Sequence, residues 1–512
     1  MAPPSPVLIV GAGPTGLTLA NALLTLGIPF RIVDKLAAPA TVSKALAVWS
    51  GSLEAFGALG LAERFIADGM RMETLRIGDN SHPLAAMPIA EGVDSPYPFT
   101  LILPQSRTEA ILTERLAESG IAVERGVELL GFTEAGRVVE ARLRHPDGEE
   151  EEAACSFLVG SDGARSAVRR GLDIPFEGFT EPQTFILSDT QMDGPLDPSS
   201  IYIWWSAAGS VALFPVTPGV WRTFAMREDP ASDEPPTLEE IQRHLTASGL
   251  GVVAHDPTWL SAFRVNERLV ASYGRGRVFL AGDAAHIHSP AGGQGMNTGI
   301  QDAMNLGWKL AAVLSGRGVA DALLGSYEAE RRPVARAVVA GAAQKLRFGM
   351  VSTSTATRVV RDALVSVASR LPVVRRKLQA ELSETDIVYD SGPLLEAVER
   401  LSTSGAPASG HRARDAALGD ARLWSRFSGA RHTLLLLGPP GAHGALRAHA
   451  ARIGSALGIE ESEAPELLQR YGFSEPGWVL VRPDQFIAAR GPARDDRAFL
   501  AYARLALEPA AE

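Results

Sequence analysis

Cysteine is almost absent from this sequence, since Cys155 is the only one in 512 residues. The chain therefore cannot form an internal disulfide or a cysteine-based zinc finger. Basic runs are missing too, and the net charge of −10 argues against nucleic acid or an anionic membrane as the main partner. The N-terminus lacks the basic region of a signal peptide, and no apolar run is long enough to span a bilayer. We expect a cytoplasmic protein without a membrane partner.

The composition is that of a folded globular protein. Hydrophobic residues make up 46% of the chain and charged residues 21%, which is typical of water-soluble domains. A length of 512 residues exceeds one ordinary domain, so we expect two or three.

Hydrophobic patterning divides the chain into three kinds of segment. Short apolar, β-branched runs alternate with helical patterns in residues 1–75, 104–175 and 270–385. Aromatic and small residues alternate between turn signals, as in an antiparallel sheet, in residues 176–269, and residues 76–103 are assigned to the same domain. Residues 386–410 contain a Ser/Gly/Pro-rich stretch that predicts a linker, and strands surround helices again in residues 411–512. The fold class is therefore α/β together with α+β.

The first chemical motif is a glycine-rich turn between a strand and a helix. The apolar strand VLIV is followed by Gly11, Gly13 and Gly16, and Asp34 ends the next strand. Glycines at this spacing bring backbone N–H groups close to a pyrophosphate, and the helix N-terminus adds positive potential. Asp34 can accept hydrogen bonds from a ribose. The spacing predicts dinucleotide binding without separating FAD from NAD.

Two further motifs follow buried strands. In "FLVGSDGARSAVRR" (157–170), Asp162 and Gly163 come directly after the apolar run. In "GDAAHIHSPAGGQGMNTGIQDAMNLGWKL" (282–310), Asp283 precedes a Pro/Gly-rich bend and a strongly periodic helix.

These three motifs, in this order, resemble those of the group A flavoprotein monooxygenases, the aromatic hydroxylases related to p-hydroxybenzoate hydroxylase. The C-terminal stretches "PASGHRARD" and "VLVRPDQFIAAR" are similar to the thioredoxin-like tail of the phenol and polyketide hydroxylases. The resemblance implies a Rossmann-like FAD-binding domain, an inserted antiparallel-sheet substrate domain and a C-terminal thioredoxin-like domain. Without a Cys-x-x-Cys pair that tail cannot be a dithiol redox centre.

The resemblance also implies which residues contact FAD. They are Gly11, Gly13, Pro14, Thr15, Gly16, Asp34, Lys35, Lys44, Gln105, Asp162, Gly282, Asp283, Pro290, Gly293, Gly295, Met296 and Asn297. Lys44 stands where the family usually has arginine, so the charge is kept but the bidentate fork is lost.

The loop after Asp283 is expected to carry the flavin ring. Residues 289–295 have no bulky side chains, which leaves room for a flat ring against the backbone. Pro290 and Gly293 are the two residues expected at the reacting centre. The helix beginning near Gly295 would direct its positive N-terminal dipole at the flavin.

The spacing His286-x-His288 leaves three other interpretations open. A metal site would use both histidines with Asp283, but no His/Cys cluster elsewhere supports it. A serine hydrolase with Ser289 or Ser166 lacks the nucleophile elbow G-x-S-x-G. A covalent histidyl-flavin is not expected of the family. We favour His286 as a scaffold residue of the loop and predict no metal.

The resemblance implies a reaction in three parts. NADPH or NADH reduces FAD, O₂ adds at C4a of the flavin, and the resulting hydroperoxide hydroxylates a phenolic or polyketide-like aromatic substrate. The same intermediate could support Baeyer–Villiger or epoxidising chemistry. A non-catalytic FAD-binding regulator is the alternative from a different class.

The sheet domain is expected to cover the flavin and to contact the substrate. Alternation along "YIWWS" places Tyr202 and Trp204 on one face of the sheet and Trp205 on the other. The candidates are Tyr202, Trp204, Trp205, Phe214, Trp221, Phe224 and Met226. The expected partners are this small aromatic substrate, O₂ and NAD(P)H, and a homodimer is also considered.

Overall fold

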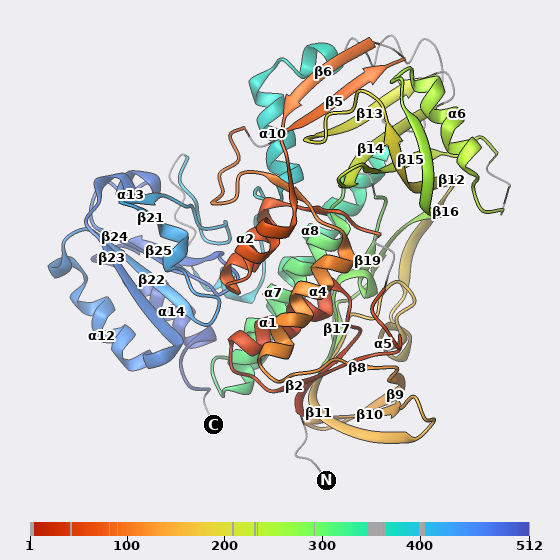
Figure 1. Cartoon of the computed structure of the whole chain (residues 1–512). Coiled ribbons are helices and arrows are strands. Elements are labelled where there is room, and N and C mark those ends of the chain that lie inside the picture. The colour runs from red at the N-terminus through yellow and green to blue at the C-terminus, as the bar shows by residue number, and fades with distance from the viewer. Residues whose placement is uncertain are drawn as a thin grey trace.

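A computed structural model of the chain has three bodies, and the central one carries a layer of long helices (Figure 1). It describes residues 5–40, 44–80, 82–89, 91–206, 209–229, 232, 234–290, 292–346, 362, 365–398 and 405–510. The C-terminal body lies at one side of the central body, and a strand-rich body lies beyond the central body's other end (Figure 1).

The central body is built on a largely parallel sheet. Its main strand order is β17-β18-β11-β1-β2-β8, and β9 and β10 extend it as an antiparallel hairpin beside β11. The buried run VLIV makes β1 a central strand, parallel to both β2 and β11, as expected of a strand covered on both faces. The strands are β1 (Ser5–Val10), β2 (Phe30–Asp34), β8 (Glu124–Arg125), β9 (Glu128–Ala135), β10 (Val138–Arg144), β11 (Glu150–Gly160), β17 (Gly274–Arg275) and β18 (Val278–Leu280).

Helices pack closely around this sheet. α1 and α7 approach each other at Gly307, where a Cβ would lie 3.1 Å from the Ala22 side chain, so glycine allows close helix packing there. The helices are α1 (Pro14–Thr25), α2 (Ser50–Ala58), α3 (Ala62–Asp68), α4 (Gln105–Glu118), α5 (Ala167–Gly171), α7 (Gly295–Leu314) and α8 (Ala320–Leu346). A small antiparallel sheet, β3 (Ala47–Val48), β7 (Thr100–Ile102) and β4 (Met70–Met72), lies beside them.

The second body is an eight-stranded sheet of order β19-β16-β12-β15-β14-β13-β5-β6. Helix α6 (Leu238–Ser248) packs on one face through Ile241 and Leu245. The strands are β5 (Thr74–Asp79), β6 (His82–Pro88), β12 (Phe176–Asp193), β13 (Ser200–Ser206), β14 (Gly209–Thr217), β15 (Val220–Met226), β16 (Val253–Val270) and β19 (His286–Ile287). Because β19 belongs to the third sequence motif, that motif joins the two bodies directly.

The C-terminal body has a four-stranded sheet of order β23-β22-β24-β25, in which only β22 and β23 are parallel. Its elements are β22 (His432–Leu437), α12 (Gly444–Ile453), β23 (Leu457–Ser462), α13 (Pro465–Arg470), β24 (Gly477–Val481), β25 (Ile487–Pro492) and α14 (Arg497–Ala506), preceded by the hairpin of β20 (Ala417–Leu418) and β21 (Ala421–Arg422). Its core packs against Trp308 of α7 and Leu323 of α8.

The segment that connects α8 of the central body to the C-terminal body includes α10 (Pro372–Ser383) and α11 (Pro393–Glu396). Parts of the expected linker (399–404) and of the preceding helical region (347–361 and 363–364) lie outside the described residues. Within the part of the chain that is described, no helix is both long and apolar enough to cross a membrane.

Candidate active site

The first motif forms a tight turn that only glycine can make. Gly11 has φ +105°, and a Cβ there would lie 2.4 Å from the Ser161 carbonyl oxygen. A Cβ on Gly16 would lie 2.0 Å from the Gly11 oxygen, whereas nothing lies within 4 Å of one on Gly13. Helix α1 begins directly after this open position, with Pro14 in its first turn. Its first N–H groups have no partner within the helix, so they are available to an anion at Gly13.

Asp34 lies beside this turn and accepts a hydrogen bond from it. Its carboxylate accepts hydrogen bonds from Ala12 N at 2.7 Å and from Leu36 N at 2.8 Å. Arg125 approaches the same carboxylate at 3.7 Å, and its buried Nη2 has no hydrogen-bond partner. Lys35 is exposed. Arg125 was not among the sequence candidates, although its place at the end of the strand next to β2 was a usable signal.

Gln105 holds the chain segment that carries Lys44. Its side-chain oxygen accepts from Ala45 N at 3.2 Å, while its amide nitrogen donates to Glu109 at 2.8 Å. The Gln105 backbone N–H donates to the Ala45 oxygen at 3.0 Å. These contacts fix the start of the segment before β3, and the Lys44 side chain is exposed.

The second motif presents Asp162 at the end of β11. One carboxylate oxygen accepts from Ala167 N at 2.6 Å and Val168 N at 3.3 Å, and so caps α5. The other oxygen is buried without a partner. Arg169 donates to the Ala284 carbonyl at 3.2 Å, which ties this motif to the third.

The third motif begins with Gly282 and Asp283. Gly282 has φ +60°, and a Cβ there would lie 2.4 Å from the Thr15 hydroxyl, so the first and third motifs touch. The Asp283 side chain is exposed, yet burial by the surrounding protein raises the pKa of its carboxyl, opposed by the nearby His286 and Lys44.

The two histidines do not converge with Asp283. His286 Nε2 lies 2.7 Å from Asp302 of α7, a buried carboxylate that also accepts from Gly282 N at 3.1 Å. His288 Nδ1 donates to the Ser289 carbonyl at 2.7 Å, and burial lowers the pKa of its imidazole to about 4. Among the residues described, no group of three or more His, Cys, Asp or Glu side chains could hold a metal ion. The contacts of His286 are those of a scaffold residue.

The loop before α7 is held open by two consecutive glycines. Gly292 and Gly293 have φ of +102° and +63°, and the Gly293 oxygen accepts from Trp49 Nε1 at 3.1 Å and from Asn297 Nδ2 at 2.9 Å. Pro290 is exposed, and Ala291 lies outside the described residues. Gly295 and Met296 form the first turn of α7 with Asn297. Trp49, which the sequence did not single out, therefore braces the loop.

The substrate candidates are split between the two faces of the second sheet. Tyr202, Trp204 and Trp221 pack with Ile241 and Leu245 of α6 on one face. The other face carries Phe214, Phe224 and Met226 beside Phe185, Phe263 and Leu346. Trp205 shares that face but lies at its far end, against Ile77, Met87 and Leu378. The structure thus places Tyr202, Trp204 and Trp221 on the opposite face of the sheet from the other four candidates.

The face of Phe224 is the one turned toward the third motif. Phe214 packs in one cluster with Leu46 and Ala47, and Ala47 lies 3.3 Å from a Cβ built on Gly293. On the same face Arg222 forms a bidentate pair with Asp189 at 2.7 Å and donates to the Lys44 carbonyl at 3.0 Å. The face of the sheet that carries Phe214 and Phe224 therefore lies close to the loop of Gly292 and Gly293.

Several of these features fit FAD. Gly13 leaves open space in front of a helix N-terminus, and Arg125 Nη2 and Asp162 Oδ1 are buried polar atoms without partners. Buried polar groups are normally satisfied, so these two atoms, next to the first motif through Asp34 and Ser161, are available to a polar ligand. Donors and acceptors of both kinds suit a molecule with a pyrophosphate, two sugar-like chains and a flat ring.

Comparison with known proteins agrees with this geometry. The family model described as "FAD binding domain" matches residues 4–342. The chain is 37% identical to 6-methylpretetramide 4-monooxygenase of Streptomyces rimosus, over 95% of this chain and 90% of that protein. It is 33% identical to 12-dehydrotetracycline 5-monooxygenase/anhydrotetracycline 6-monooxygenase of Streptomyces rimosus subsp. rimosus, over 94% of each.

A solved structure gives the same result for the whole fold. OxyS anhydrotetracycline hydroxylase from Streptomyces rimosus superposes with a TM-score of 0.80 at 31% identity, covering 98% of this chain and 99% of that chain. The fold is a mixed α/β arrangement with the FAD-binding fold of the aromatic hydroxylases. The chain belongs to the group A flavoprotein monooxygenases and is an FAD-dependent monooxygenase.

Proposed function

We propose that this enzyme uses NAD(P)H and O₂ to hydroxylate a polycyclic, polyketide-like aromatic compound. The observation that carries the proposal is the aromatic face of the second sheet, which lies close to the loop of Gly292 and Gly293. Phe185 and Phe224 stack at 5.2 Å between ring centroids, and Phe263 lies 6.1 Å from Phe224. Relatives named for tetracycline-type substrates match nearly the whole chain, which supports a large flat substrate.

The chain's own residues would hold FAD along one path. The N-terminus of α1 with Gly13, Pro14 and Thr15 would bind the pyrophosphate, and Asp34 with Arg125 the adenosine end. Asp162, Asp283 and Lys44 would bind the polar chain, and residues 290–297 the ring. When bound there, FAD supplies hydride acceptance from NAD(P)H and the activation of O₂.

The substrate would lie between the loop at Pro290 and Gly293 and the inner face of the second sheet. Phe214, Phe224 and Met226 are proposed contacts because they face the loop. Tyr202, Trp204 and Trp221 are left out because α6 covers them. The protein's work is to orient the ring and to exclude water from the reacting centre.

We also propose a domain division for the chain. The FAD-binding domain comprises residues 1–75, 104–175 and 270–385, the substrate domain 76–103 and 176–269, and the C-terminal domain 411–512 after a linker. A βαβ unit of β22, α12 and β23 followed by a hairpin and α14 supports a thioredoxin-like tail. A tail without a dithiol has a structural task.

The decisive experiment is a screen of polycyclic phenols for stimulated NAD(P)H oxidation by the purified, FAD-loaded protein, followed by product mass and NMR. We expect one substrate class to accelerate oxidation and to gain one oxygen on a ring. Ring expansion in the product would assign Baeyer–Villiger chemistry instead. Bound FAD without stimulated oxidation by any compound would contradict the proposal and favour a binding protein.

A further inference from the structure

The C-terminal domain inserts a charged side chain between the two long helices of the FAD-binding domain. The Arg482 guanidinium donates to both carboxylate oxygens of Glu330 on α8, at 2.8 and 2.9 Å. The side chains of Arg482 and Glu330 are 1% and 0% exposed. Because a bidentate pair sets both distance and orientation, this contact fixes the domain against α8.

Helix α7 completes the cluster around this pair. Lys309 donates to Glu330 at 2.8 Å, and Asn305 and Trp308 each donate to Asp484 at 3.2 Å. Asp484 also accepts from Arg482 Nε at 2.9 Å. The positive charges of Arg482 and Lys309 balance the negative charges of Glu330 and Asp484. Polar contacts from α7, α8 and the C-terminal domain thus hold their shared interface, here called the seam.

A second cluster, one turn earlier on α7 and one residue further on α8, holds Gly282 at the start of residues 282–297, here called the flavin loop. Asp302 of α7 accepts from Arg331 Nε at 2.8 Å, besides its bonds to His286 and to Gly282 N. Arg331 also donates to the Thr298 carbonyl at 3.1 Å. The conformation of Gly282, directly before Asp283, thus depends on where Asp302 stands.

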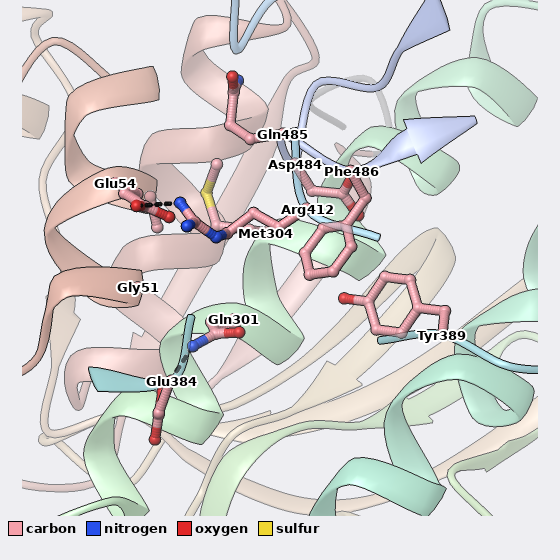
Figure 2. A pocket seen from close by; sticks show the side chains of 11 residues that line it. Gly51, Glu54, Gln301, Met304, Glu384, Tyr389, Arg412, Asp484, Gln485 and Phe486 are labelled. Carbon is pink, nitrogen blue, oxygen red and sulfur yellow. Dashed lines mark hydrogen bonds and ion pairs between the residues drawn. The ribbon is translucent and has the colours of Figure 1, made fainter. Parts of the chain in front are cut away.

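The two clusters are connected by neighbouring residues and by one aromatic stack. Glu330 and Arg331 are consecutive on α8, so one faces the C-terminal domain while the other faces the loop. Tyr389 accepts from Arg331 at 3.4 Å, stacks on Phe486 at 4.1 Å, and lies 5.2 Å from the Arg482 guanidinium. Figure 2 shows Tyr389 and Phe486 side by side in this seam, with Met304 and Gln301 of α7 nearby.

The seam is not filled by apolar packing alone. A small pocket lies in it between α2, α7 and the C-terminal domain, bounded by the pairs Glu54–Arg412 and Gln301–Glu384 (Figure 2). Polar contacts from Asp484 and Arg482 therefore reinforce the apolar packing of α7 and α8 against the C-terminal domain at this point.

We propose that Arg482 is a positioning residue for the flavin loop: through Glu330, Arg331 and Asp302 the C-terminal domain holds Gly282 and Asp283 in place for FAD. The inference rests on FAD binding by this family and not on the identity of the substrate. The competing view is that Arg482 only attaches the domain, with no consequence at the loop.

The test compares two buried arginines of the same domain in the full-length protein. Arg482→Met removes the contact to α8. Arg490→Met is the matched control, because Arg490 is also buried and lies 4.3 Å from an aromatic ring, Phe473, but donates to Pro407 and Tyr471. The readouts are the FAD dissociation constant of the apoprotein, from flavin fluorescence, and amide hydrogen exchange in residues 282–297.

We expect Arg482→Met to weaken FAD binding by roughly 5- to 30-fold and to speed exchange in the loop, while Arg490→Met lowers only the thermal midpoint. If Arg482→Met does not fold, Arg482→Lys, which keeps the charge but loses the fork, should show the same changes in smaller size. Unchanged FAD affinity and loop exchange in the folded variant, or equal changes in both methionine variants, would overturn the proposal. Neither readout requires substrate, so the result is independent of the hydroxylation screen.

Discussion

The N-terminal end of α7 and the α7–α8 seam differ in how their polar groups are satisfied. Near the N-terminal end, Asp283 is exposed, and Asp162 of the second motif keeps a buried oxygen without a partner. In the seam, Glu330 and Arg482 are more deeply buried, yet each has several short hydrogen bonds. Both regions are rich in charge. The described side-chain atoms of Glu330, Arg482 and Lys309 all have partners, although Glu384 Oε1 and Gln485 Oε1 at the edge of the seam are buried without one.

This difference separates a ligand site from structure. A buried or closely surrounded polar group without a partner costs free energy, which a ligand can recover. A saturated cluster recovers that cost within the protein and serves to fix geometry. The direction of the pKa shifts agrees, since burial raises the pKa of the Asp283 carboxyl, whereas Arg482 and Lys309 hold that of Glu330 at about 2 despite its burial.

The largest effect is expected in the seam. Glu330→Ala leaves Arg482 and Lys309 buried with too little negative charge, and should lower the free energy of unfolding by about 3–5 kcal/mol. Urea denaturation of the apoprotein measures this. Glu475→Ala, which removes the partner of the exposed Arg494, is the control and should leave the midpoint unchanged. Equal midpoints for both variants would contradict the distinction.

Asp283→Ala should show the opposite profile. The apoprotein should be as stable as the wild type, because the carboxylate has a desolvation cost there and few compensating contacts. FAD affinity should fall by roughly 10- to 100-fold, as expected for losing hydrogen bonds to a charged group. Apoprotein thermal melts and flavin fluorescence titration measure the two quantities. Unchanged FAD affinity would reject a cofactor role for Asp283.

The two faces of the second sheet allow a similar comparison between a residue proposed to contact the substrate and a residue that only packs in the core. Phe224→Ala should raise the substrate KM roughly 10-fold, because an apolar contact to the substrate is lost. Trp221→Phe, on the face covered by α6, should lower the thermal midpoint and leave KM unchanged. Steady-state kinetics with the substrate from the screen decides. A larger KM effect for the Trp221 variant would assign the substrate to the other face.

The last prediction concerns the pH dependence of stability, which is the smallest effect when it is expressed per pH unit. Burial raises the pKa of the Glu384 carboxyl from 4.5 to about 8. Between these pH values the folded state keeps a proton that the unfolded state has released. Stability from this group is complete below pH 4.5 and is lost as pH rises toward 8, by at most about 1.4 kcal/mol per pH unit. Glu384→Gln should therefore flatten the decline of the thermal midpoint between pH 5 and about 8. An unchanged slope would contradict this assignment.

The parts of the site that could be predicted from the sequence were those in which the local backbone requires particular residues. Gly11, Gly16 and Gly282 occupy positions where backbone atoms or Thr15 leave no room for a Cβ, and such constraints appear as fixed glycine spacings. The family membership and the FAD cofactor predicted from these motifs are confirmed. The individual contacts of the site residues with FAD stay predictions.

Other parts of the site had no local signal. Trp49 and Arg331 brace the loop from outside the third motif, and Asp302 lies inside that motif without any local sign of its contacts to His286 and Arg331. Alternation separated Tyr202 and Trp204 from Trp205, but it could not say which face α6 covers. A residue pattern fixes which side chains share a face, and packing decides what that face meets.

The sequence alone determined the nucleotide-binding turns, the strand-to-helix order and the family, because these depend on backbone conformations that few residues allow. The tertiary structure alone decided that His286 pairs with Asp302, that Phe224 faces the loop and that Arg482 reaches Glu330. These contacts join residues up to 152 positions apart, and only the packing of whole elements brings such residues together.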